Sequence, residues 1–137
     1  MAGVVRFGIS LDKELFARFS AMITKRGWKN RSDAFGRLIR EELVKEEWAS
    51  GQECAGAITL IYDHHKRELV NRLMDIQHDF GALILSSQHI HLDHHNCLEV
   101  IAVKGTAGLA RRLTDALRSV KGIKHATLSM STTGKDM

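Results

Sequence analysis

Hydrophobic and polar residues alternate near the start of the chain, over residues 4–10. Successive side chains of an extended strand point to opposite faces, so this alternation predicts a short strand with one apolar and one polar face. The apolar positions are Val5, Phe7 and Ile9, and the polar positions are Arg6, Gly8 and Ser10.

Apolar residues then recur at every third or fourth position, which predicts two amphipathic helices. The first follows Ser10, a candidate N-cap, and ends at Gly27, since glycine commonly stops a helix. The second begins near the cap candidates Asn30 and Ser32. One strand cannot form a sheet, and about 48 residues rarely build a sufficient core. We therefore expect the strand to pair with its copy in a second chain, while the helices seal a shared core.

The small, polar stretch SGQECAG, residues 50–56, is typical of a linker, and a different pattern follows it. Strands are predicted over 57–63, 82–92, 97–105 and 123–130, and helices over 64–80 and 106–122. This βαββαβ order predicts an α+β fold with an antiparallel four-stranded sheet and both helices on one face.

The same pattern predicts burial and domain boundaries. The first helix of the second part should bury Leu69, Val70, Leu73, Met74 and Ile76, and the second should close at Gly122. The expected organisation is a domain over 1–49, the linker over 50–56 and a second domain over 57–137.

Charge is distributed unevenly along the chain, whose formal net charge is +4. Residues 1–40 hold nine Lys and Arg against three Asp and Glu, a net charge of +6, so the remainder carries −2. A basic first part suggests a polyanionic partner such as nucleic acid, although a solvated helical surface would have the same composition. No apolar run could span a bilayer and no secretion signal is recognised, so two cysteines in a reducing cytoplasm are expected.

The stretch QHIHLDHHNCLEV concentrates four of the eight histidines beside a cysteine. In a strand, His89 and His91 share a face and lie about 6–7 Å apart. If residues 92–96 form a five-residue loop, Cys97 lies opposite His91 and Glu99 lies opposite His89 on that face. A four-residue loop would turn Cys97 to the other face.

A thiolate with two imidazoles suits Zn, Cu or Ni much better than Mg or Ca, and Glu99 could accept a hydrogen bond from an imidazole. The alternative is an exposed histidine-rich turn beside a buried free thiol. A four-ligand site needs one more group, for which His78 at the end of a predicted helix is the candidate, supplied by a symmetry mate. His64 and His65, at a strand–helix junction, could bind metal weakly, contact phosphate or cap the helix, and capping or exposure is expected. His94 and His95 are expected to be exposed in the turn, and His125 has no visible partner.

The chain resembles the nickel-responsive transcriptional regulator family (NikR) in the stretches GWKNRSDA, YDHHKREL, IQHDF, HIHLDHHNCLEV and IAVKG. The resemblance implies a ribbon-helix-helix domain followed by an ACT-like, ferredoxin-like domain. It implies one planar Ni(II) site per subunit, with His89, His91 and Cys97 from one subunit and His78 from a neighbour. It further implies a cytoplasmic bacterial or archaeal repressor of nickel uptake or homeostasis genes that forms a homotetramer, a dimer of dimers.

The resemblance also implies binding to double-stranded operator DNA with an inverted repeat. In a ribbon-helix-helix protein the paired strands enter the major groove, where Arg6 could read guanine and Ser10 could contact a base edge or phosphate. Gly8 departs from the polar residue expected between them, so the operator should differ from the family's best-known one. Phosphate contacts are expected from Asn30, Arg31, Ser32, Lys66 and Arg67.

Other interpretations stay open at this point. Some family members hold an additional cation with acidic residues early in the second helix; Asp33 matches one of these, but Arg37 occupies the other position. Histidine and cysteine also bind Cu, Zn or Co, and an ACT-like domain could sense an amino acid. A metal buffer or zinc enzyme is a third alternative. Four protein ligands would leave no open position for a substrate, and no catalytic set is recognised, so we do not expect an enzyme.

Overall fold

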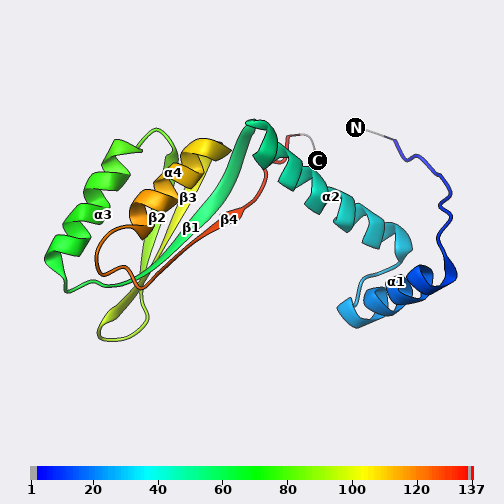
Figure 1. The fold of residues 1–137 in the computed structure, drawn as a ribbon, viewed down its shortest axis with the longest axis horizontal. Helices are drawn as coiled ribbons and strands as arrows, with labels where there is room; N and C mark the ends of the chain where they lie inside the picture. Colours follow the sequence, from blue (N-terminus) through cyan, green and yellow to red (C-terminus); the bar gives the residue numbers. More distant parts are fainter. Residues whose placement is uncertain (1–2, 136) are drawn as a thin grey trace. The chain divides into compact units, whose positions relative to one another are not determined.

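The computed structural model describes residues 3–135 and residue 137 (Figure 1). The chain divides into two compact units, Met1–Glu41 and Glu42–Met137. The first contains helix α1 (Lys13–Arg26) and the start of helix α2 (Arg31–Ser50), and the second contains the remainder of α2 and a sheet with two further helices.

Local capping determines where the first two helices begin and end. The side chain of Asp12 accepts a hydrogen bond from the backbone N–H of Leu15 at 2.9 Å, so Asp12 caps α1 and the expected cap Ser10 is wrong. Gly27 ends α1 with a φ of 66°, as predicted, because glycine adopts this left-handed conformation without a steric penalty. Asn30 caps α2 through a 2.8 Å hydrogen bond from the N–H of Asp33.

Residues 3–12 belong to no helix or strand in the single chain. A strand is defined by hydrogen bonds to a neighbouring strand, and we expected this segment to find its neighbour only in a second copy. Val4 and Phe7 are 87% and 71% exposed. They border a groove of about 1120 Å³ within the first unit, which is also lined by Phe16 and Phe35. In a dimer with a shared core, apolar side chains of the second chain would fill such a groove.

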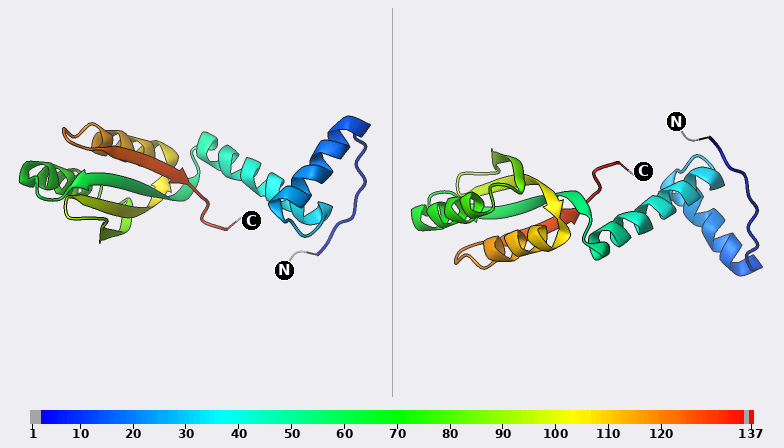
Figure 2. Two further views of the ribbon diagram at one scale, coloured as in Figure 1. Left: turned by 90° about the horizontal axis from the view of Figure 1, so that it is seen from below. Right: turned by 90° about the horizontal axis from the view of Figure 1, so that it is seen from above.

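The second unit has the predicted βαββαβ order (Figures 1 and 2). Its elements are β1 (Glu53–Asp63), α3 (Arg67–Asp79), β2 (Ile84–His91), β3 (Asn96–Thr106), α4 (Ala107–Arg118) and β4 (His125–Met130). All pairings are antiparallel, and the strand order is β2-β3-β1-β4. Both helices cover the same face of the sheet, so the predicted fold class is confirmed.

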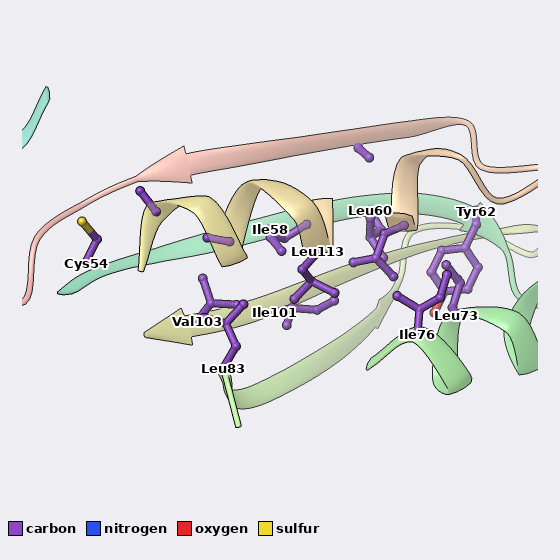
Figure 3. Packing of buried hydrophobic residues seen from close by; sticks show 14 of the residues in the cluster. Cys54, Ile58, Leu60, Tyr62, Leu73, Ile76, Leu83, Ile101, Val103 and Leu113 are labelled. Atoms are coloured by element: carbon purple, nitrogen blue, oxygen red, sulfur yellow. The ribbon is translucent and has the colours of Figure 1, made fainter. Parts of the chain in front are cut away.

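The core lies between this sheet face and the two helices (Figure 3). Ile58 and Leu60 of β1 and Leu113 of α4 are completely buried, and Leu73 of α3 is 1% exposed. Met74, which we predicted to be buried, is 62% exposed. The buried residues of α3 are Leu69, Leu73 and Ile76, so its buried stripe is narrower than predicted.

The predicted linker is largely structured. β1 begins at Glu53, inside residues 50–56, and Cys54 is only 2% exposed. The end of α2 packs into the same core, since Trp48 is 2% exposed and its Nε1 donates to the carbonyl of Ser131 at 2.7 Å. At the other helix, α4 ends at Arg118 and not at the predicted Gly122. No helix in the described part of the chain is long and apolar enough to cross a membrane.

Candidate metal centre

The β2–β3 hairpin has the register that a five-residue connection gives. His91 pairs with Cys97, and His89 pairs with Glu99. β3 is also paired with β1, where Tyr62 lies opposite Cys97. His91, Cys97 and Tyr62 therefore form one row across three strands, on the face that α3 and α4 cover. Antiparallel strands hold directly opposed side chains within about 5 Å, close enough for metal ligands to converge.

Glu99 is a buried acid with a complete set of partners. It is 1% exposed, and its carboxylate accepts hydrogen bonds from the hydroxyl of Tyr62 at 2.7 Å and from Nε2 of Gln77 at 3.0 Å. Burial and the hydrogen bond to Glu99 raise the pKa of Tyr62 far above its usual range, so the hydroxyl stays protonated and keeps donating. The acid is thus held firmly beside the hairpin histidine His89.

Both ring nitrogens of His89 face this buried group. Nδ1 lies 3.4 Å from the hydroxyl of Tyr62, and Nε2 lies 3.5 Å from Glu99 Oε2. His89 is nevertheless exposed along its other edge, with a side chain 55% accessible. Glu99 can therefore orient the ring through one nitrogen while the other becomes a metal ligand after a side-chain rotation.

His91 is held by a different contact. Its ring stacks on His64, with centroids 4.4 Å apart and ring planes only 4° from parallel. His64 is half-buried beside the helix-covered end of β1, and its Nδ1 has no hydrogen-bond partner in the described chain. Burial, followed by the nearby charges of His65 and His91, lowers the pKa of His64. The lowered pKa favours the neutral form of His64, in which the ring adds no charge to its stack with His91.

Cys97 is a free thiol and is 1% exposed. Although it shares a row with His91, the donor atoms of His89, His91 and Cys97 are not gathered in the single chain. Among residues 3–135 and 137, the one set of three ligand atoms lying within 4.8 Å of one another belongs to a different group of side chains. The backbone thus presents the predicted ligands on one face, and rotation of at least one side chain must bring the donor atoms together.

His78 lies one residue before the end of α3 and is exposed. It lines a cavity of about 390 Å³ together with His89, Glu99 and Tyr62 of the same chain. The sequence alone did not place His78 near its own hairpin. The cavity shows that His78 and His89 border the same space within one subunit.

The sequence did not identify Tyr62 and Gln77 as parts of this centre. Tyr62 is the last inward position of the alternating strand 57–63, and Gln77 directly precedes His78. Their roles depend on the β1–β3 register and on how α3 packs. Alternation marks Tyr62 as buried, but no sequence signal points to its partner Glu99.

The expected DNA-contact residues lie at exposed positions of the chain. Arg6, Gly8 and Ser10 belong to the exposed segment 3–12, and a Cβ added at Gly8 would meet no atom within 4 Å. At the start of α2, the Asn30 side chain accepts a hydrogen bond from the N–H of Asp33. In the described chain, the N–H groups of Arg31 and Ser32 have no hydrogen-bond acceptor. Those two amides point from a helix N-terminus, which favours anions.

Lys66 and Arg67, the other expected phosphate contacts, are exposed at the start of α3. Lys66 is the N-cap residue, and its side chain makes no capping hydrogen bond. Within the described chain, Nδ1 of His64 has no partner and Nδ1 of His65 faces Asp63, so neither has the capping role we considered. His94 and His95 are exposed in the turn, as expected. His125 is also exposed, at the start of β4.

Asp33 and Arg37, at the two positions of the additional cation site of some family members, form an ion pair. Nε of Arg37 lies 3.0 Å from Oδ2 of Asp33. This hydrogen bond is the main cause that lowers the pKa of Asp33. The guanidinium occupies the carboxylate that a cation would need, so the ion pair is a further argument against this additional site, whose presence the sequence left open.

Comparison with known proteins gives the same two-part division. Residues 55–131 match the NikR C terminal nickel binding domain, and residues 5–46 match the ribbon-helix-helix protein, copG family. The solved structure of the uncharacterized protein TM1266 from Thermotoga maritima aligns with a TM-score of 0.53 at 11% identity, over 58% of this chain and 98% of its own. That likeness concerns the fold alone.

Full-length relatives are similar along almost the entire chain. A protein of Syntrophus aciditrophicus (strain SB) is 53% identical over 135 residues, covering 98% of both chains. A protein of Chlorobaculum parvum is 56% identical over 96% of this chain and 98% of its own, and one of Pyrococcus furiosus is 48% identical over 98% and 99%. All three carry nickel-responsive regulator in their names. The chain therefore belongs to the NikR family of nickel-responsive regulators, a family of transcription regulators and not of enzymes.

Proposed function

We propose that this protein is a repressor that binds operator DNA when Ni(II) occupies a site formed by His89, His91 and Cys97 of one subunit and His78 of the partner subunit. The observation that carries the proposal is the hairpin register, which puts a thiol and two imidazoles on one face next to a buried carboxylate. The genes controlled would be those of nickel uptake or homeostasis.

The donor set fits Ni(II) well. When bound, Ni(II) would supply a planar four-coordinate centre, a geometry that nitrogen and sulfur donors favour for Ni(II) and Cu(II) but not for tetrahedral Zn(II). Cys97 would give the thiolate, and burial would shield its sulfur from solvent. Glu99 would hold one nitrogen of His89 and so fix which nitrogen faces the site.

Two arrangements could supply His78. The cavity that His78 shares with His89 supports a ligand from the same chain, whereas a ligand from the partner subunit would tie two chains together. We favour the second, because a site that spans two subunits makes occupancy change their arrangement, which a switch requires. One ion per subunit follows from this arrangement. A dimer of dimers follows when the paired segments 3–12 and the shared metal sites join different pairs of chains.

DNA contact would come from the exposed segment 3–12 of two chains paired as a ribbon. Pairing would fill the apolar groove beside Phe7 and Phe16 and direct Arg6 and Ser10 outward. The free amides at the start of α2 would hold a backbone phosphate. Two such dimers linked in a tetramer would bind a spaced inverted repeat more tightly through effective concentration.

A gel mobility-shift assay tests the proposed function. The probe is a DNA duplex enriched from a random pool by the nickel-loaded protein. We expect retardation with Ni(II) and its loss when a chelator is added. Equal retardation under both conditions, or failure to enrich any duplex, would contradict nickel-dependent repression. Calorimetry with amino acids and with Cu(II), Zn(II) and Co(II) separates the amino-acid sensor and the other metal sensors from this proposal.

The ligand assignment has its own spectroscopic test. A thiolate bound to Ni(II) gives a sulfur-to-metal charge-transfer absorption, so Cys97→Ala should abolish this band while Cys54→Ala, at the other cysteine, keeps it. Cys54 is buried and lies near the start of β1, whereas Cys97 lies at the hairpin end of β3. A band that persists in Cys97→Ala would show that the sulfur ligand is a different one.

A further inference from the structure

A second group of ligand side chains lies outside the proposed nickel set. It consists of Asp63 at the end of β1, His65 in the turn before α3, and His95 in the β2–β3 turn. One ligand atom from each lies within 4.8 Å of the other two. No member of this group belongs to the set His78, His89, His91 and Cys97.

The sheet register is what brings these distant residues together. Asp63 pairs with Asn96 at the last position of the β1–β3 ladder, so the preceding residue His95 reaches the end of β1. The turn itself is fixed by Asp93, whose Oδ1 accepts the backbone N–H of His95 at 2.9 Å and that of Asn96 at 2.8 Å. Lys124 contributes a further hydrogen bond to the Asn96 side chain.

Asp63 and His65, the other two members of the group, also contact each other. Oδ1 of Asp63 accepts the backbone N–H of His65 at 2.9 Å and lies 3.2 Å from its Nδ1. The carboxylate is thereby directed toward the imidazole and not into solvent. Two separate backbone turns, 63–65 and 93–96, thus present their ligands to one point.

The surface around this point is rich in imidazole and open to ions. The His65 side chain is 53% exposed. Its ring centroid lies 5.6 Å from that of His94 and 6.0 Å from that of His95. Metal–nitrogen bonds of about 2.0–2.1 Å place neighbouring ligand atoms roughly 3–3.5 Å apart. The three ligand atoms lie no more than 4.8 Å apart. The largest separation therefore needs to close by at most about 1.8 Å, which exposed side chains can do by small rotations.

We propose that Asp63, His65 and His95 form a second site for a borderline divalent transition-metal ion such as Ni(II) or Zn(II), with water completing the coordination. Two imidazoles and a carboxylate without sulfur suit such ions. Exposure and the water ligands make this site weaker than a closed four-ligand site. The proposal does not depend on the nickel site, because it shares no ligand with it.

Equilibrium dialysis of the full-length protein against Ni(II) tests the proposal, with the metal counted by atomic emission. A parallel titration follows the thiolate charge-transfer absorption. The wild-type protein should bind two ions per chain, and only the tighter one should produce the absorption. Cys97→Ala should lose the absorption but keep the weaker ion, which separates the two sites.

The variants His65→Asn, His95→Asn and Asp63→Asn should each raise the dissociation constant of the weaker ion about tenfold or more, the loss seen even when an outer partner of a metal site is removed. Their absorption should remain that of the wild type. Asp63→Asn keeps the oxygen that accepts from the His65 N–H, so it changes the charge with little change of the turn.

His94→Asn is the matched control, because His94 lies in the same turn and outside the ligand group. It should leave the weaker dissociation constant within about twofold of the wild type, as expected for a surface substitution worth less than 0.5 kcal/mol. Unchanged binding in His65→Asn and His95→Asn, or an equal loss in His94→Asn, would overturn the proposed site. Absence of the absorption in the wild type would instead count against the nickel site.

Discussion

Glu99 is the residue around which the proposed nickel site is organised. It is a buried acid bound by Tyr62 and Gln77 and adjacent to His89. Glu99→Gln keeps the shape but removes the charge that orients the imidazole. We expect nickel affinity to fall about 10- to 100-fold, the usual loss when an outer partner is removed.

A chelator competition assay measures that fall. Glu68→Gln, on the exposed first turn of α3, is the control for the loss of one negative charge and should bind as the wild type does. Equal affinity of Glu99→Gln and the wild type would mean that Glu99 does not act on His89.

His64 is a second residue with an indirect role, since it touches His91 by ring stacking. His64→Ala should free the His91 side chain and weaken nickel binding roughly two- to tenfold, the entropic cost of ordering one side chain. His64→Phe keeps an aromatic ring and removes the unpaired Nδ1, so it should bind nearly as the wild type does. The same competition assay compares the two, and an equal loss in both would rule out stacking as the cause.

At the scale of elements, the end of α2 is part of the second unit's core. Trp48 is buried there and donates to Ser131. We expect Trp48→Ala to lower the free energy of unfolding by about 3–5 kcal/mol, as for other large aromatic deletions. Trp48→Phe should cost about 1 kcal/mol through the lost hydrogen bond.

Urea unfolding followed by circular dichroism measures these values, at one protein concentration because assembly shifts apparent stability. Glu46→Ala, an exposed position of the same helix, should stay within about 0.5 kcal/mol of the wild type. A Trp48→Ala protein as stable as this control would contradict the packing of α2 on the sheet.

The elements differ in how far the sequence determined them. The sequence reduced the hairpin register to two cases, because the loop length decides which face Cys97 takes. The observed pairing of His91 with Cys97 is that of the five-residue loop. The cap of α1 was misassigned because Ser10 and Asp12 are both good caps two residues apart. The strand over residues 4–10 needs a partner that one chain does not contain.

The second ligand group shows what the sequence could not reveal. From the sequence, His65 was interpreted as an exposed or capping residue that could at most bind metal weakly, and His95 as an exposed residue of the hairpin turn. The β1–β3 ladder joins positions more than 30 residues apart, and only this register brings Asp63 beside His95. Contacts between distant segments of this kind have no local signal.

At the scale of the whole molecule, a shared metal site would join subunits and thereby control DNA binding. The same cavity borders His78 and His89 within one chain, so the claim that His78 acts from the partner subunit needs a direct test. The two halves of the site can be disabled in different chains: Cys97→Ala damages the hairpin, and His78→Ala removes the fourth ligand.

The decisive measurement mixes these two variants in equal amounts by joint refolding and follows the thiolate–nickel absorption at a Ni(II) concentration that leaves each variant alone unloaded. If His78 comes from the partner subunit, random assembly completes about a quarter of the sites. The absorption and the nickel-dependent retardation of DNA should then return. If His78 serves its own hairpin, no mixed assembly contains a complete site. A mixture that shows no more thiolate–nickel absorption than the separate variants would contradict the shared centre.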